Sequence, residues 1–281
     1  MSGLSGLRRD GRHRRRPRAM RYEILGKIRV VDGATISTVS ARKIEVLLAV
    51  LLVRSGQVVG TTQLMTEIWG EHPPRRASAG LHVYVSQLRK FLSRPGSAGS
   101  PIITTQPGYL LQLGSDELDV QVFQRLVNQG RAEQRAGCLE EACMSFGAAL
   151  NLWRGPALGD LRDGPLVNGF AGWAEQARLE CTEKLVDAGL MLGRHRELAS
   201  YLYTLTIEYP LREVFYQQLM LALYRSGCQA DALKVYQSAR AVLMDELGLE
   251  PCRSLRDLQR AILLGDPQLE LAAAQLQGAA A

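Results

Sequence analysis

Alternating apolar and polar positions near the start of the chain predict a small antiparallel sheet. Tyr22, Ile24, Ile28 and Val30 lie on one apolar face, and the charged residues Glu23, Lys27 and Arg29 lie on the other. The turn Asp32-Gly33 then leads to a second extended segment over residues 35–39. We expect these segments to pair as neighbouring strands.

Apolar residues that recur every three or four positions predict three helices next, over about residues 41–55, 61–69 and 76–93. Ser40 is expected to cap the first helix, and Thr61 or Thr62 the second. Residues 102–113 contain two short strands around a Gln-Pro-Gly turn. A leading sheet, three helices and a β-hairpin form the order of a winged helix-turn-helix, which we predict over residues 21–114.

The third helix has two chemically different faces. Its buried stripe is predicted to contain Leu81, Val85, Leu88 and Leu92. The opposite side carries His82, Val83, Ser86, Lys90 and Ser93. Five cations and no carboxylate lie between residues 75 and 94, so this helix suits a DNA major groove, with the hairpin as a wing on the backbone or minor groove. A solvated basic helix is the alternative.

Charge is unevenly distributed along the chain. Residues 1–21 hold eight Arg and one Asp, residues 22–110 carry a net charge of +5, and residues 111–281 carry −6. A basic front half joined to an acidic rear half favours a polyanionic partner for the front. A charged tail followed by two ordinary protein surfaces is the alternative.

A repeated helical pattern is predicted for the rear half. Gly137, Gly193 and Gly227 are each followed at +5, +9 and +12 by small or apolar residues. The last two glycines are 34 residues apart, which is the tetratricopeptide period. Gly137 and Gly193 are farther apart than one period, and we place the extra residues, an insertion in the repeat, in residues 153–169. We predict a tetratricopeptide-like all-α domain over residues 115–265, a kind of domain that usually binds protein. A helical bundle with loop glycines is the alternative.

The sequence offers no positive sign of catalysis. It contains no GxxxxGK[ST], HExxH or GxSxG motif. Four scattered His and five Cys without a CxxC pair predict no metal site. We therefore expect no enzyme, no catalytic residue and no cofactor.

No apolar run is long enough to span a membrane, and we expect a cytoplasmic, nucleoid-associated protein without membrane partners. Trp69, Trp153 and Trp173 are expected to be core anchors.

Two interpretations stay open for residues 1–20, which are rich in Arg, Gly and Ser and are expected to be disordered. One is a basic arm that contacts DNA. The other is a natural start at Met20, with residues 1–19 outside the natural protein. Residues 266–281 are expected to form a flexible tail.

Two segments resemble one family of bacterial regulators. The run LMTEIWGEHPPRRASAGLHVYVSQLRKFL, followed by TTQPGYLL, resembles the DNA-binding domain of the Streptomyces antibiotic regulatory proteins, which is similar to the winged helix of OmpR/PhoB-type response regulators. The ending DELGLEPCRSLRDLQRAIL resembles the close of that family's bacterial transcriptional activator domain. The resemblance covers about residues 21–265.

The resemblance implies a small, stand-alone transcription activator of antibiotic or secondary-metabolite biosynthesis promoters. Such proteins bind direct repeats of double-stranded DNA near the −35 element, commonly as a side-by-side, head-to-tail dimer. They recruit RNA polymerase holoenzyme through sigma factor, with the alpha and beta subunits as further partners. Two alternatives are a repressor with the same DNA contacts and a tetratricopeptide-type interaction scaffold or ligand sensor.

The resemblance also assigns site residues. Those expected to contact DNA are Arg76, His82, Tyr84, Ser86, Gln87, Arg89, Lys90, Arg94, Thr104 and Thr105. Lys90 and Arg94 are assigned to phosphates. Those expected to contact polymerase form the loop before the third helix: Glu71, His72, Pro73, Pro74 and Arg75. Ser86, Gln87 and Thr105 stand where response-regulator relatives often carry Arg, so their base preference is not carried over.

Overall fold

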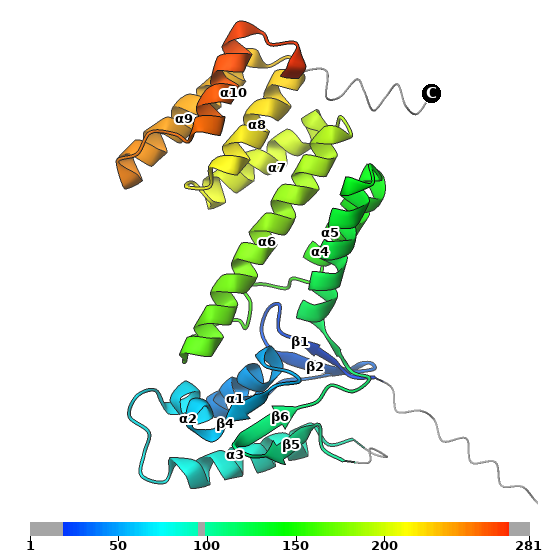
Figure 1. Cartoon of the computed structure of the whole chain (residues 1–281), viewed down its shortest axis with the longest axis vertical. Helices are drawn as coiled ribbons and strands as arrows, with labels where there is room; N and C mark the ends of the chain where they lie inside the picture. The colour runs from blue at the N-terminus through cyan, green and yellow to red at the C-terminus, as the bar shows by residue number, and fades with distance from the viewer. Residues whose placement is uncertain (1–18, 95–98, 270–281) are drawn as a thin grey trace, which may run out of the picture. The chain divides into compact units, whose positions relative to one another are not determined.

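The computed structural model describes residues 19–94 and 99–269, which divide into two compact units. Unit 1 extends to Val120 and also contains the separate segment Gly155–Ala171. Unit 2 contains Gln121–Arg154 and the described chain from Gly172 onward. Small sheets and three helices followed by an all-helical part confirm the predicted fold class (Figure 1). Residues 1–18 of the predicted arm and 270–281 of the predicted tail lie outside the described residues.

The leading sheet of unit 1 has four strands. They are β1 (Arg21–Glu23), β2 (Arg29–Asp32), β3 (Thr35–Ser37) and β7 (Glu117–Leu118), in the order β3-β2-β1-β7. The predicted antiparallel pairing across the Asp32-Gly33 turn is confirmed for β2 with β3. The single strand expected from Tyr22 to Val30 is wrong, because the chain turns back around Gly26, with φ of 141°, and β1 pairs antiparallel with β2. The parallel strand β7 was not predicted, because its two residues are too short to show an alternating pattern.

Three helices pack together in unit 1: α1 (Arg42–Val53), α2 (Thr61–Trp69) and α3 (Ala77–Phe91). The middle of α1 is buried on all sides, as its apolar sequence predicts. The predicted Ser40, Thr61 and Thr62 caps are wrong. Ala41 and Gly60 occupy the N-cap positions, and neither makes a side-chain cap hydrogen bond. Gly60 takes that position because an unpredicted strand runs directly into α2.

That strand, β4 (Val58–Gly60), joins the predicted hairpin of β5 (Ile102–Thr105) and β6 (Gly108–Leu111) in a sheet ordered β4-β6-β5. Gly108 is required where β6 meets β4. A Cβ atom at this position would lie 1.9 Å from the carbonyl oxygen of Val59. The hairpin is therefore held against the helical core by close backbone contact.

The segment Gly155–Ala171 is part of unit 1, although the predicted boundary places it in the rear domain. Ala157, Leu158 and Leu161 are buried, and the Leu158 amide donates to the Ile24 carbonyl oxygen over 2.8 Å. The structure thus places the insertion expected in residues 153–169 largely with the winged helix, rather than with the repeats.

A buried carboxylate from α2 holds the end of this segment. Glu67, 1% exposed, accepts hydrogen bonds from the amides of Leu166 (2.8 Å) and Val167 (3.3 Å) at the start of α6 (Pro165–Met191). Anionic groups favour this position because the first amides of a helix lack helical partners. Gly164 leaves room for it, since a Cβ atom there would lie 2.2 Å from the Glu67 Oε2 atom.

The remaining helices are α4 (Asp119–Arg135), α5 (Leu139–Leu150), α7 (His195–Glu208), α8 (Glu213–Arg225), α9 (Gln229–Leu247) and α10 (Arg253–Leu264). The three repeat glycines all have φ between 78° and 81° and join α4 to α5, α6 to α7 and α8 to α9. This left-handed conformation favours glycine and ends the preceding helix. The predicted repeat of helical hairpins is therefore confirmed.

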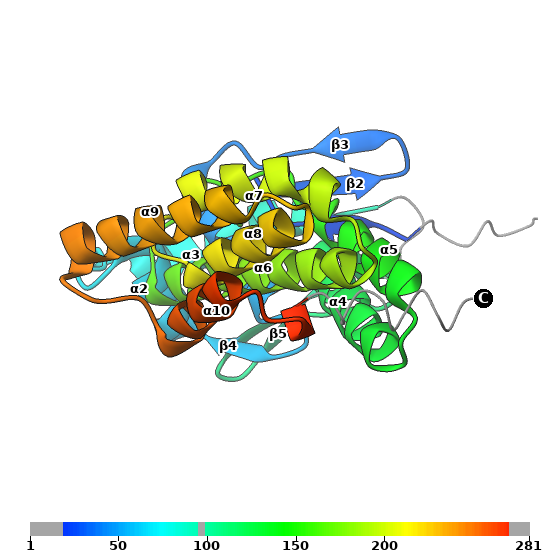
Figure 2. The same cartoon turned by 90° about the horizontal axis from the view of Figure 1, so that it is seen from above.

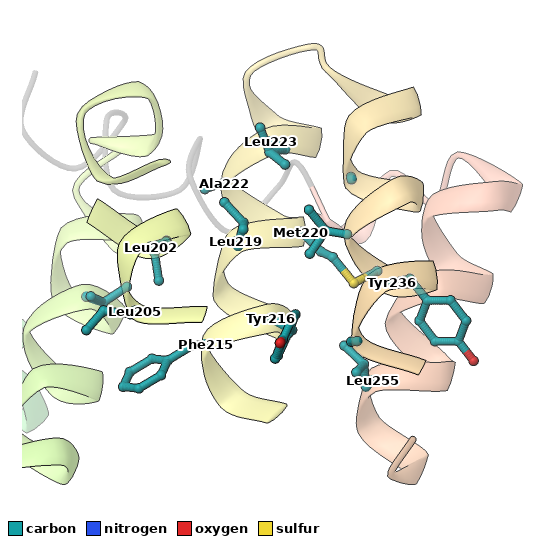
Figure 3. Packing of buried hydrophobic residues seen from close by; sticks show 14 of the residues in the cluster. Leu202, Leu205, Phe215, Tyr216, Leu219, Met220, Ala222, Leu223, Tyr236 and Leu255 are labelled. Carbon is teal, nitrogen blue, oxygen red and sulfur yellow. The ribbon is translucent and has the colours of Figure 1, made fainter. Parts of the chain in front are cut away.

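A continuous apolar core holds the later hairpins together. In α8, Phe215 points toward Leu205 of α7, while Tyr216 and Met220 lie on the side of α9 (Figure 3). Helix α8 packs against both α7 and α9, and α10 packs on α8 and α9 (Figure 2).

One expectation fails, because Trp173 of α6 is 43% exposed rather than a core anchor. Among residues 19–94 and 99–269, no helix is both long and apolar enough to cross a bilayer.

Candidate nucleic-acid interface

Helix α3 buries one stripe and exposes the rest of its surface. Ala77, Leu81, Val85 and Leu88 are buried, as their helical spacing predicts. The exposed positions form two rows with a spacing of four residues, Ser78-His82-Ser86-Lys90 and Ala79-Val83-Gln87. The structure therefore brings the predicted residues His82, Ser86, Gln87 and Lys90 onto one solvent-facing surface.

This surface is positively charged. Lys90 and, just before the helix, Arg75 and Arg76 are exposed and make no ion pair with any residue in the described part of the chain. Helix α3 itself contains no Asp or Glu. Nothing within the helix therefore compensates these cations, and a polyanion can approach them without displacing an internal partner.

Arg89 differs from its neighbour Lys90, although both carry one positive charge. Its guanidinium is half-buried and donates to the Ile102 carbonyl oxygen from Nε (3.2 Å) and Nη2 (3.0 Å). Nη2 also donates to the Thr104 hydroxyl oxygen over 2.7 Å. Arg89 thus joins α3 to the wing strand β5 instead of pointing freely into solvent.

A second polar contact joins α3 to the wing. The Tyr109 hydroxyl of β6 lies 2.8 Å from the His82 Nδ1 atom. Thr104 is exposed on β5, whereas Thr105 at the end of that strand is half-buried. Helix α3 and both strands of the hairpin are therefore linked through side chains as well as through the core.

Two further residues assigned to DNA contact, Tyr84 and Arg94, have partners outside the wing. Tyr84 is half-buried and stacks on Trp69 of α2, with the ring centroids 5.7 Å apart. The Arg94 guanidinium forms an ion pair with Asp116, whose side chain is 3% exposed. Burial raises the pKa of the neighbouring Tyr22 to about 12. The structure brings Tyr84 and Arg94 into the packing of unit 1, away from the exposed rows of α3.

The loop between α2 and α3 is solvent-exposed. Every residue assigned to polymerase contact is exposed, from Glu71 to Arg75. Gly70, with φ of 70°, ends α2, and the Ala77 amide donates to the Pro74 carbonyl oxygen over 2.8 Å as α3 begins. Adjacent prolines prevent a continuous helix here, so an exposed loop separates α2 from α3.

Val83 lies on the outer face of α3, as its spacing predicts, but it is not among the residues assigned to DNA contact. Its side chain is 52% exposed, between Ala79 and Gln87 in one row. A β-branched apolar residue exposed on a helix face that also carries His, Ser, Gln and Lys is the signal that identifies it. Apolar side chains in such positions contact thymine methyl groups in the major groove.

An acid-free helix braced against a β-hairpin on a three-helix core defines a winged-helix protein, here followed by tetratricopeptide-like hairpins. The chain matches two family profiles, "Transcriptional regulatory protein, C terminal" over residues 38–111 and "Bacterial transcriptional activator domain" over residues 118–263. The chain belongs to the Streptomyces antibiotic regulatory protein family of transcriptional regulators.

Relatives support this assignment along most of the chain. Regulatory protein DnrI of Streptomyces peucetius is 35% identical over 89% of this chain and 94% of its own length. Transcriptional regulator RedD of Streptomyces coelicolor is 36% identical over 89% of this chain and 72% of its own. The structure of Mycobacterium tuberculosis EmbR in complex with a low-affinity phosphopeptide superposes with a TM-score of 0.84, at 32% identity, and covers 92% of this chain and 69% of that one.

Proposed function

We propose that unit 1 binds duplex DNA sequence-specifically, with α3 in the major groove and the β5–β6 wing on the adjacent backbone or minor groove. The exposed, acid-free face of α3 carries this proposal. Lys90, Arg75 and Arg76 lie on or beside that face without an ion pair to any described residue. Cations in this position neutralise phosphates and release condensed counterions, which drives association with DNA.

Base edges are read from the middle of the same face. Gln87 has the amide geometry that pairs bidentately with adenine, and Ser86 and His82 offer single hydrogen bonds. Val83, exposed beside them, provides an apolar surface for a thymine methyl group. Arg76, at the N-cap of α3, is exposed and extends the phosphate contacts.

The protein acts as an activator that recruits RNA polymerase. A side-by-side dimer on direct repeats near the −35 element places the exposed loop of residues 71–75 beside polymerase holoenzyme, with sigma factor as the first partner and the alpha and beta subunits as further ones. Each added contact worth about 1.4 kcal/mol raises promoter occupancy roughly tenfold while occupancy is low. The family points to antibiotic and secondary-metabolite biosynthesis promoters, and the site of action is the nucleoid in the cytoplasm.

Footprinting on the promoters of the chain's own gene cluster, with and without polymerase holoenzyme, tests this function. We expect protection of direct repeats, extended toward the start site when polymerase is added. In vitro transcription from the same template should rise with protein concentration. A fall in transcription with the same footprint indicates the repressor, and no footprint at all indicates an interaction scaffold.

The counterion argument predicts the behaviour of Lys90→Ala. Removing one phosphate contact is expected to weaken binding and to lower the slope of log K against log salt by about 0.9. Fluorescence anisotropy on the footprinted DNA between about 0.05 and 0.3 M salt measures this slope. Lys234→Ala removes an exposed cation of α9 and serves as the control. A Lys90→Ala slope equal to that of the wild type would contradict the docking.

A further inference from the structure

The contrast between Arg89 and Lys90 suggests two roles for adjacent cations of α3. Lys90 is exposed and makes no ion pair among the described residues. Arg89 directs three hydrogen bonds at β5, two to the Ile102 carbonyl oxygen and one to the Thr104 hydroxyl oxygen. A planar guanidinium with several fixed donors suits such a bridge, whereas a Lys ammonium is a single point charge.

The hydrogen bond from Arg89 to the Thr104 hydroxyl oxygen determines which further hydrogen bond that hydroxyl can make. A Thr hydroxyl has one proton to donate and two lone pairs that accept. Because the oxygen already accepts from a cation over 2.7 Å, its own proton stays available for another acceptor. Thr104 is exposed on the wing, so that acceptor comes from outside the protein. A phosphate oxygen of the DNA backbone accepts such bonds from hydroxyl groups.

We propose that Arg89 is a positioning residue, which holds β5 against α3 and orients the Thr104 hydroxyl as a donor to a DNA phosphate. The inference rests on the proposed DNA binding and adds a role that charge alone would not assign. Arg89 then contributes to affinity through Thr104, and Lys90 contributes through direct neutralisation. The His82–Tyr109 contact fixes the other strand of the hairpin, so the wing moves with α3.

A double-mutant cycle on the footprinted DNA tests this role. Arg89→Ala and Thr104→Val, which keeps the shape but removes the hydroxyl, are each expected to weaken binding about threefold to tenfold, the range of one hydrogen bond. The double variant should bind no more weakly than the worse single variant, because both changes remove one interaction. The wild type and Lys90→Ala are measured beside them at every salt concentration.

Two further measurements separate positioning from direct phosphate contact. Arg89→Lys keeps the charge but cannot bridge two acceptors in the same way, so we expect it to bind as weakly as Arg89→Ala. The salt slope should stay near the wild-type value in both Arg89 variants and in Thr104→Val, while it falls by about 0.9 in Lys90→Ala.

Several outcomes would overturn the proposal: additive effects in the cycle, wild-type binding by Thr104→Val, rescue by Arg89→Lys, or an Arg89→Ala slope lowered as in Lys90→Ala. Circular dichroism of each variant checks folding. If Arg89→Ala does not fold, Arg89→Lys and Thr104→Val decide the question. If the wild-type protein protects none of the promoters tested by footprinting, the proposed DNA binding itself is refuted.

Discussion

At the scale of single residues, internal partners decide which cations of unit 1 can meet a phosphate. Lys90 has none among the described residues, Arg89 is bound to β5, and Arg94 is paired with Asp116. All three lie within six positions of one another and carry the same charge. Partners from distant strands and loops give them different roles, so proximity in the sequence is a poor guide to DNA contact.

Arg94→Ala is expected to lower stability rather than DNA contact. The change leaves the Asp116 carboxylate, which is 3% exposed, without its cation. Because the Arg94 side chain retains some exposure, we expect a loss of about 2–3 kcal/mol in the free energy of unfolding of unit 1. Hydrogen exchange of the α1 amides measures it. The salt slope of DNA binding should not change, and a slope lowered as in Lys90→Ala would restore Arg94 as a phosphate contact.

At the scale of elements, strand β6 of the wing packs so closely against the backbone of β4 that the residue at the contact cannot have a side chain. Gly108 and Gly60 are partners in the register of β6 and β4. A Cβ atom on Gly108 would overlap the Val59 backbone, whereas one on Gly60 meets nothing within 4 Å. Glycine is therefore required at position 108, whereas position 60 on the paired strand has room for a side chain.

Gly108→Ala is therefore expected to destabilise unit 1 by about 3 kcal/mol or more, since backbone atoms on both sides must move. Gly60→Ala, the matched control, should change stability by no more than about 1 kcal/mol, because its φ of −66° suits alanine. Urea unfolding of the two variants checks this difference. Equal stability of the two proteins would show that the β4–β6 contact is not constrained as described.

At the scale of the whole molecule, unit 1 is built from two separate stretches of the chain. The segment Gly155–Ala171 supplies buried Ala157, Leu158 and Leu161 and the amides that Glu67 binds. A buried carboxylate that loses its donors is costly, and so is apolar surface returned to water. The winged-helix unit therefore includes a stretch of chain that begins more than thirty residues after Val120.

A protein that ends at residue 120 should accordingly have a less stable winged helix than the full chain. We expect faster hydrogen exchange in α1 and α2 and weaker DNA binding at elevated temperature. Glu67→Ala in the full chain, which removes only the cap on α6, should produce part of the same effect, about 1–2 kcal/mol. Identical exchange in the truncated and full proteins would show that unit 1 folds without this segment.

Local spacing was sufficient to predict the three helices, the hairpin and the repeat glycines, because burial stripes and left-handed turns are properties of neighbouring residues. It also placed Ser86 and Lys90 correctly on the outer face of α3. Strands β4 and β7 were missed, since two or three residues carry no periodicity and form only when partners arrive.

The internal partners of Arg89, Tyr84 and Arg94 and the place of Gly155–Ala171 could not be derived in the same way. Each depends on an atom brought close by the fold: a carbonyl oxygen of β5, the ring of Trp69, the carboxylate of Asp116 or that of Glu67. Helical periodicity states which way a side chain points, because that direction follows from the backbone a few residues away. Whether it meets solvent or a partner is settled by contacts between segments far apart in the chain.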